Sequence, residues 1–442
     1  MTKSKITKLI FTITILSQVC SAQSVVIDVD NDLESPQKYA VEELNAALTN
    51  RGFKVDGGND YTISIVSIGN KTELFNKPES FKIENSNNVI SLFASDVVGS
   101  MYGIYELAEE IKYSEKTGVS ILESIKDKYS EPALEIRADN PFLTIDENKT
   151  GISNWFYDVE YWERYFEKLA RNRYNICDIH AMYVYETTGF PNIFPFFLIN
   201  PKYPEASWQD EDQQHNLDML KRIVGIAKDH GVNVSLMNYA TEFPNTNMGK
   251  EAELAEKTSW AVAKLLNEIP DLWMFGFRIG ESGKSEKFFE HSYLDGIEKS
   301  GKENVRLYTR TWLAEFRDMI KIGMKYPDNF YIEIKYNGEH LGAPYHAMQG
   351  RWHSYSYEKY LNYPRYWKII WQIRPNGTHR VFPWNDIEFV KRTVESCKFG
   401  GAVGFTLEPI TAYYPQNPDL TYKNAEKYKF MSYTTDRYWS WY

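Results

Sequence analysis

Two glutamates with cationic neighbours are the residues of this sequence best suited to chemistry. Glu281 lies in Phe277-Arg-Ile-Gly-Glu-Ser-Gly, a turn whose flanking glycines can expose a carboxyl group. Glu333 lies in Tyr331-Ile-Glu-Ile-Lys-Tyr, and Lys335 follows it on the same face of a candidate strand. Two carboxyl groups facing one sugar can provide the acid and the base of glycosidic bond hydrolysis. We therefore predict that Glu281 and Glu333 are catalytic, with Tyr336 and His340 as further proton carriers.

Cationic side chains are expected around these glutamates. In a parallel barrel, one set of alternating side chains faces the surrounding helices and is apolar, while the other set faces the interior. Applied to each candidate strand, this rule places inside the barrel Arg137 with Asp139, Asp178 with His180, Arg278, Tyr308 with Arg310, Glu333 with Lys335, Gln372 with Arg374, and Glu408.

A positively lined pocket would bind the carboxylate of an acidic sugar through charge-assisted hydrogen bonds. The alternative for each cation is a structural ion pair with a neighbouring carboxylate. We predict a substrate-binding set that also includes Trp384 as a flat platform for a sugar ring: Arg137, His180, Arg278, Arg310, Lys335, Arg374, Trp384 and Glu408. No metal or other cofactor is predicted, although His340 and His346 share one loop.

The elements that must position these residues alternate between strand and helix from about residue 131 onward. Eight candidate strands are separated by amphipathic stretches such as Val159 to Arg171 and Lys250 to Glu268. Eight such units predict an α/β fold of the (β/α)8 TIM-barrel type over residues 131–442. The strands are expected at 133–138, 174–184, 232–239, 272–279, 304–311, 329–337, 367–374 and 401–408.

Residues 24–130 are predicted to form a small α/β domain in front of the barrel. Short β-rich runs begin at Ser24, Tyr61, Phe81 and Val89, and a helical pattern runs from Pro36 to Thr49. A second helix is expected from residue 99. This segment contains no catalytic constellation.

The first 22 residues have the pattern of a secretory signal peptide. Three lysines precede an apolar stretch from Leu9 to Leu16, and Cys20-Ser-Ala offers small residues for cleavage. We expect export to the periplasm or the exterior. A lipoprotein is less favoured because Val19, which is not a small residue, precedes Cys20.

Composition limits the possible partners. The formal net charge of −10 disfavours binding to nucleic acid or to an anionic membrane surface, and no segment predicts membrane insertion. Twelve tryptophans and 32 tyrosines suit carbohydrate binding, because aromatic faces stack on sugar rings, although a large aromatic core would need them too. The expected partner is an acidic oligosaccharide, and the oligomeric state is not predicted.

Residues 24–420 resemble the α-glucuronidase type of glycoside hydrolase. The run Gly99-Ser-Met-Tyr-Gly-Ile-Tyr-Glu-Leu-Ala after Asp96 resembles the end of the small domain that precedes the barrel in those enzymes and in hexosaminidase-like glycosidases. The resemblance implies hydrolysis of a terminal glucuronic acid with inversion, with Glu281 matching the acid and Glu333 matching part of the base. The seventh strand departs from that family, because it ends in Gln372 and Arg374 where the family has a carboxylate.

Three functions are compatible with this sequence. The first is α-glucuronidase-like hydrolysis at the terminal uronic acid of acidic oligosaccharides during polysaccharide degradation. The second is β-elimination at the same sugar by a lyase or dehydratase, which needs cations to stabilise an enolate-like intermediate and a side chain to move the proton. The third is a carbohydrate-binding protein without activity, for which buried glutamates beside cations would be costly.

Overall fold

A computed structural model describes residues 23–407, apart from positions 31, 59, 67–71, 145–154, 180, 184–191, 209–211, 245–249, 338–344, 347–356, 358 and 374–385. The signal-peptide prediction for residues 1–22 therefore lies outside the described residues and stays a prediction. Within the described part of the chain, no helix has both the length and the apolar character needed to cross a membrane.

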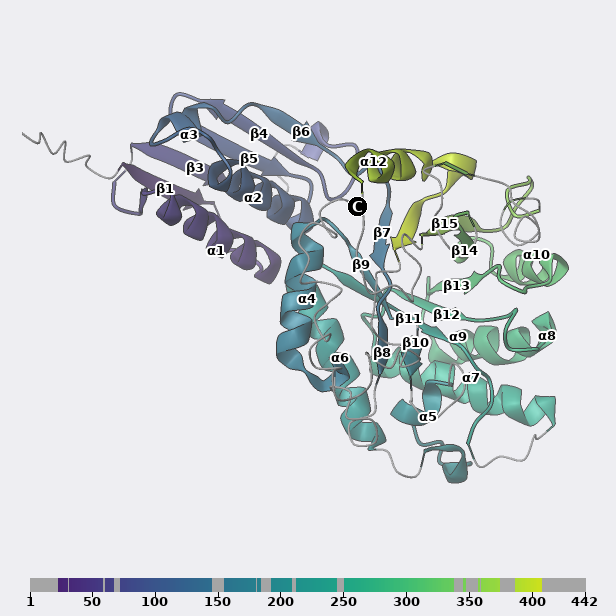
Figure 1. Cartoon of the computed structure of the whole chain (residues 1–442). Coiled ribbons are helices and arrows are strands. Elements are labelled where there is room, and N and C mark those ends of the chain that lie inside the picture. Colours follow the sequence, from purple (N-terminus) through teal and green to yellow (C-terminus); the bar gives the residue numbers. More distant parts are fainter. Residues whose placement is uncertain are drawn as a thin grey trace, which may run out of the picture.

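The N-terminal segment folds around a six-stranded sheet of order β2-β1-β3-β5-β4-β6. β2, β1, β3 and β5 are parallel to one another, whereas β4 is antiparallel to both of its neighbours, β5 and β6. Two long helices, α1 and α2, pack against each other beside the sheet (Figure 1). The elements are β1 (Ser24–Val29), α1 (Ser35–Asn50), β2 (Lys54–Val55), β3 (Tyr61–Ile65), η1 (Thr72–Leu74), β4 (Phe81–Ser86), β5 (Val89–Ala94), α2 (Val97–Lys112), α3 (Ser120–Glu123) and β6 (Lys128–Ser130).

Eight parallel strands close into a barrel of order β11-β12-β13-β14-β15-β16-β7-β9. This confirms the predicted TIM-type fold, and each strand falls in or next to one of the eight predicted segments. The strands are β7 (Ile136–Asp139), β9 (Ile176–Ile179), β11 (Asn233–Asn238), β12 (Met274–Phe277), β13 (Arg306–Arg310), β14 (Phe330–Lys335), β15 (Lys368–Ile373) and β16 (Gly404–Leu407).

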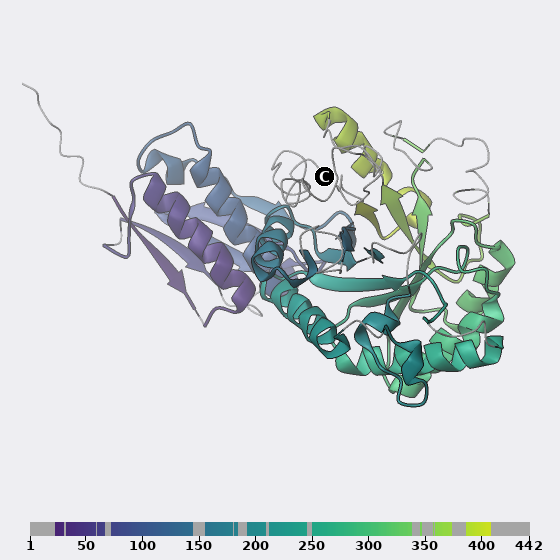
Figure 2. The same ribbon diagram turned by 60° about the horizontal axis from the view of Figure 1, so that its bottom comes forward.

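Helices surround the barrel on its outer side (Figure 2). They are α4 (Val159–Arg171), α6 (Gln213–Asp229), α7 (Glu251–Glu268), α8 (Glu286–Phe289), the π-helical η4 (Glu290–Leu294), α9 (Asp295–Ser300), α10 (Phe316–Lys325) and α12 (Ile387–Ser396). The connections contain β8 (Phe142–Thr144), η2 (Trp155–Tyr157), β10 (Ala181–Tyr183), α5 (Phe194–Phe197), η3 (Pro204–Ala206) and η6 (Phe399–Gly401), and β8 pairs with β10.

Aspartates determine where several of these helices begin. The side chains of Asp96, Asp158, Asp212 and Asp386 each accept a hydrogen bond from a backbone N–H in the first turn of α2, α4, α6 and α12. Such N-caps satisfy one of the donors that a helix start leaves without an intrahelical partner. The helix starts are therefore encoded locally, and tertiary packing only has to orient the helices.

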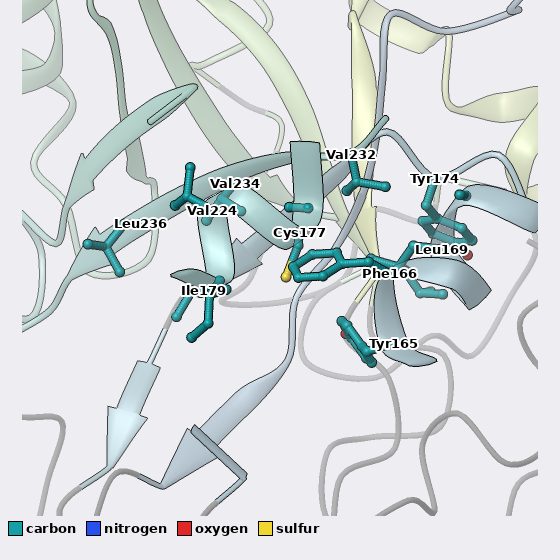
Figure 3. Close-up of a cluster of buried hydrophobic side chains, with 14 of the residues drawn as sticks. Tyr165, Phe166, Leu169, Tyr174, Cys177, Ile179, Val224, Val232, Val234 and Leu236 are labelled. Atoms are coloured by element: carbon teal, nitrogen blue, oxygen red, sulfur yellow. The ribbon is translucent and has the colours of Figure 1, made fainter. Parts of the chain in front are cut away.

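The outer core lies between the barrel and its helices. Figure 3 shows Tyr165, Phe166 and Leu169 of α4 packed near Cys177 and Ile179 of β9. Cys177 is fully buried and forms no disulfide, as expected for a cysteine that acts as a small apolar residue.

The N-terminal domain docks on the side of the barrel through specific contacts (Figures 1 and 2). Tyr39 of α1 stacks on His230, which follows α6, with ring centroids 4.2 Å apart. Glu79 accepts hydrogen bonds from Arg137 and from Asn175, the latter at 2.9 Å. Because these contacts join charged groups and aromatic rings of both units, they fix the position of the barrel strands β7 and β9 relative to the small domain.

Candidate active site

One polar side chain from the C-terminal end of each barrel strand, or from the residues directly after it, forms a layer inside the barrel, which we call the polar layer. The other inward-facing side chains of these strands are largely apolar, and most of them lie closer to the N-terminal end of the strand than the polar layer does. They include Ile176, Met274 and Ile370. The carboxyl ends of barrel strands are where TIM-barrel enzymes place their active sites. The polar layer consists of Asn140, Asp178, Tyr239, Arg278, Arg310, Glu333, Gln372 and Thr406, all buried.

Two ion pairs between arginine and glutamate dominate this layer. Arg310 donates from Nε to Glu333 Oε2 at 2.6 Å, and neither side chain is more than 2% exposed. The other oxygen of Glu333 accepts a hydrogen bond from Thr406 Oγ1 at 2.8 Å. Arg278 pairs with Glu281, which lies in the turn after β12 and keeps 26% of its side chain exposed. One glutamate is therefore deep in the barrel and the other is at its mouth.

Tyr239 links the two ion pairs. Its hydroxyl accepts a hydrogen bond from Arg278 Nη1 at 2.5 Å and another from Arg310 Nη1 at 3.5 Å. Its ring also lies 4.4 Å from the guanidinium carbon of Arg278, which is cation–π geometry. Burial lowers the pKa of Arg278 because it penalises the charged form. The tyrosine therefore helps to stabilise a charge that burial disfavours.

A third carboxyl group, Asp178, is buried in the same layer. Tyr308 donates a hydrogen bond to its Oδ1, and Asn140 donates one to Oδ2 at 3.2 Å. Burial, assisted by the charge of Glu333, raises the pKa of Asp178 well above its usual value. Gly276 makes room for this contact, because a Cβ atom there would collide with the ring of Tyr308.

Lys335 completes the cations of the mouth. Its Nζ lies 3.9 Å from the ring centroid of Trp312, which follows β13. Trp312 is half-buried, and the backbone of its loop touches Gly280 so closely that a side chain at position 280 would not fit. The turn that bears Glu281 is thereby fixed against the loop that bears Trp312.

Arg137 and Asp139 do not face the lumen, contrary to the prediction. Arg137 pairs with Glu79, contacts the hydroxyl of Tyr102, and lines a cavity of about 240 Å³ at the junction with the N-terminal domain. Asp139 accepts a hydrogen bond from Tyr165 of α4. The alternation rule fails on β7 because its outer face meets a second domain and a tyrosine rather than an apolar helix surface.

Tyr336 also lies away from the predicted catalytic position. Its hydroxyl contacts Ser396 Oγ at 2.5 Å, and its ring packs near Trp371, on the outer side of the barrel next to α12. It follows Lys335 directly, so strand alternation turns it to the opposite face. Its burial raises its pKa to about 12, which also disfavours proton transfer near neutral pH.

Five predicted residues lie outside the described residues: His180, His340, Arg374, Trp384 and Glu408. His346 is described, and both of its ring nitrogens have partners, Tyr357 Oη and the carbonyl of Ser396, each at 2.9 Å. The structure therefore brings together Arg278, Glu281, Arg310, Glu333 and Lys335 from the predicted set.

Sequence reasoning missed Tyr239, Asn140 and Thr406. The alternation that places Arg278 and Glu333 inside also points to Tyr239 and Thr406. Leu236, three residues before Tyr239, and the two residues adjacent to Thr406, Phe405 and Leu407, are in the outer core. The predicted site is built mainly from charged side chains, so it omits these polar residues. Asn140 follows from the alternation of β7 once Ile136 and Ala138 are known to face inward.

The polar layer can perform acid–base chemistry on an anionic ligand. Together with Glu281 and Lys335 at the mouth, it combines carboxyl groups at two depths with guanidinium and ammonium groups that a low-dielectric environment makes strongly attractive for anions. Glu333 accepts hydrogen bonds from two donors, which suits a base or a nucleophile. Glu281 is more exposed and lies at the entrance, which suits a group that meets a leaving oxygen.

No family model and no curated protein sequence matches this chain. Among solved structures it is similar to a GH138 enzyme targeting pectin rhamnogalacturonan II, with a TM-score of 0.69 and 18% identity. That match covers 94% of this chain and 63% of the other, so the chain spans less than two thirds of that enzyme.

Two further structures are similar at a lower level. The β-N-acetylhexosaminidase of Bacteroides fragilis NCTC 9343 has a TM-score of 0.53 at 12% identity, with 88% of this chain and 81% of that chain covered. CpGH84B has a TM-score of 0.51 at 15% identity, with coverages of 94% and 69%. These structural neighbours are glycoside hydrolases built on a TIM barrel, and at such identities the likeness shows the shared fold.

Proposed function

We propose that this chain is a glycoside hydrolase that removes a terminal uronic acid from acidic oligosaccharides during polysaccharide degradation. The observation that carries the proposal is the arrangement of two arginine–glutamate pairs, joined by Tyr239, at the carboxyl ends of β12, β13 and β14. The fold shared with glycoside hydrolases, one of which is an enzyme targeting pectin rhamnogalacturonan II, supports it. The predicted signal peptide suits an enzyme that meets polysaccharide outside the cytoplasm.

The roles of the residues follow from their depth and their partners. Arg278, Arg310 and Lys335 bind the carboxylate of the sugar, because all three are luminal cations near the mouth. Glu281 protonates the leaving glycosidic oxygen. When the substrate carboxylate replaces Glu281 as the partner of Arg278, the glutamate side chain can turn toward that oxygen. Glu333, held by Arg310 and Thr406, acts as the base or nucleophile on the opposite side of the sugar.

Elimination at the uronic acid is the second candidate, and one observation favours it. Gln372 is buried in the polar layer at the end of β15, where α-glucuronidase-like enzymes carry a carboxylate. In this reaction a base removes the proton beside the uronate carboxylate, the leaving group departs from C4, and the cations stabilise the enolate-like intermediate. The two reactions need the same anion-binding residues, so the products must distinguish them.

The test is incubation of the purified protein with oligosaccharides that end in glucuronic or galacturonic acid, including fragments of rhamnogalacturonan II. Hydrolysis adds one water across the products. A dehydratase removes one water from the intact oligomer and a lyase cleaves without change in total mass, and both create an ultraviolet-absorbing double bond. Glu281→Gln and Glu333→Gln are the loss-of-activity variants, and oligosaccharides ending in a neutral sugar are the control. Equal turnover of acidic and neutral ends, or no turnover of any uronate, would overturn the proposal.

A further inference from the structure

Arg278, Tyr239 and Arg310 come from three successive barrel strands and meet at one hydroxyl group. Tyr239 follows β11, Arg278 follows β12, and Arg310 ends β13. The tyrosine is 6% exposed and each arginine 2%. A phenolic oxygen has two lone pairs, so it can accept both hydrogen bonds, at 2.5 Å from Arg278 and 3.5 Å from Arg310.

Two guanidinium groups held together in a buried layer repel each other, and they need groups that offset this repulsion. Glu281 and Glu333 provide the charges, one for each arginine. Tyr239 provides what the glutamates do not: one acceptor shared by both guanidiniums, and a ring face 4.4 Å from the guanidinium carbon of Arg278. The tyrosine therefore fixes the two cations relative to each other.

We propose that Arg278 and Arg310 form a clamp for a free sugar carboxylate, with Tyr239 as the positioning residue that sets the clamp. This deepens the proposed function, on which it rests, by restricting the substrate to unesterified uronates. A carboxylate brought to this point meets two planar cations whose N–H groups match its oxygens. A methyl ester has the same ring and nearly the same shape but no charge, so it gains little from the clamp.

The experiment measures binding and turnover separately. Binding of glucuronate and galacturonate, and of their methyl esters, is measured by calorimetry on the full chain, for the wild type and for Tyr239→Phe. The phenylalanine keeps the ring under Arg278 and removes only the hydroxyl. Tyr293→Phe is the matched control. This buried tyrosine of η4 accepts a hydrogen bond at 2.9 Å from Asn238, which ends β11 and lies directly before Tyr239.

We expect the wild type to bind a free uronate at least about tenfold more tightly than its ester. Tyr239→Phe should weaken binding of the free acid about tenfold or more while leaving the ester nearly unchanged, since a hydrogen bond to a charged group is lost. Tyr293→Phe should keep the wild-type acid-to-ester ratio. A purely structural role for Tyr239 would change both ligands equally.

The outcomes separate the clamp from the reaction. Equal binding of acid and ester by the wild type, no binding of either, or an equal loss on both ligands in Tyr239→Phe would overturn the clamp. Acid-selective binding that depends on Tyr239, without turnover of any uronic-acid-ended oligosaccharide, would retain the clamp and overturn the proposed function.

Discussion

Replacement of Glu333 by glutamine isolates the charge of the deepest ion pair. The amide oxygen can still accept from Arg310 Nε, as the carboxylate does at 2.6 Å. The new NH2 group can donate to Thr406 Oγ1, because a hydroxyl that now donates at 2.8 Å can rotate and accept instead. Shape and number of hydrogen bonds are therefore preserved, and only the negative charge is removed.

The magnitude follows from burial. Neither member of the pair is more than 2% exposed, so the variant removes the negative charge that lies in direct contact with the buried Arg310 guanidinium. Removing one partner from such a pair costs about 3–5 kcal/mol of unfolding free energy. The surface pair of Arg164 and Glu160, with side chains 56% and 70% exposed, provides the contrast. Glu160→Gln should cost no more than about 0.5 kcal/mol.

Equilibrium unfolding in urea, followed by circular dichroism, measures both variants at one pH. The double variant Arg310→Met/Glu333→Gln should recover part of the loss, because both buried charges are then removed. A cost below about 1 kcal/mol for Glu333→Gln would refute the reasoning, since it would show that Arg310 keeps its charge stabilised without the glutamate.

Three further perturbations test other parts of the structure. The raised native pKa of Asp178 keeps its proton bound where the unfolded chain releases it. The unfolding free energy of the wild type, relative to that of Asp178→Asn, should therefore fall as pH rises from about 4 toward the native pKa, by up to about 1.4 kcal/mol per pH unit. Urea unfolding that gives the same difference between the two proteins at pH 5 and at pH 7 would contradict this. In the same assay, Gly276→Ala should lower the unfolding free energy by about 1–3 kcal/mol, because the new Cβ displaces Tyr308. The control Gly225→Ala in α6, with open space around its Cβ, should raise the unfolding free energy by up to about 1 kcal/mol. Equal effects of the two variants would argue against a collision between the Cβ at position 276 and Tyr308. Glu79→Gln should lower the unfolding free energy by about 1.5–3 kcal/mol and make the junction near Arg137 more sensitive to limited proteolysis. An unchanged rate of cleavage would show that the ion pair between Glu79 and Arg137 does not hold the domains together.

The barrel could be predicted because each strand carries its own signal. In β14, Ile332 and Ile334 pack in the outer core, while Glu333 and Lys335 face the lumen, as alternation requires. The same rule places Arg278 and Arg310 correctly. Eight such strands with helical stretches between them leave few alternatives to a closed parallel barrel.

The prediction for Arg137 and Asp139 is wrong because their strand has an unusual neighbour. The rule assumes that the outer face of a barrel strand is apolar, and β7 violates it, because Glu79 of the N-terminal domain and Tyr165 of α4 provide partners for Arg137 and Asp139. Which domain covers which strand is a tertiary property. The sequence of β7 alone therefore could not reveal it.

The ligand of the polar layer could be predicted only as a class. Cations at strand ends indicate an anion, but the hydroxyl shared by Arg278 and Arg310 belongs to Tyr239, a residue without charge on another strand. Its role depends on how three strands are staggered around the barrel, and residue types alone do not encode this stagger.

The lumen itself distinguishes a functional role from a structural one. Much of it is filled with apolar side chains such as Ile176, Met274 and Ile370, so these strands can support an apolar interior. Buried ion pairs contribute little net stability compared with well-packed apolar residues of similar volume. A barrel that needed only stability would continue the apolar filling to the carboxyl ends, but there it places Arg278, Arg310 and Glu333. Replacing these three by methionine and leucine should therefore preserve or raise the unfolding free energy while abolishing uronate binding, and a large loss of stability would show that the pairs hold the fold instead.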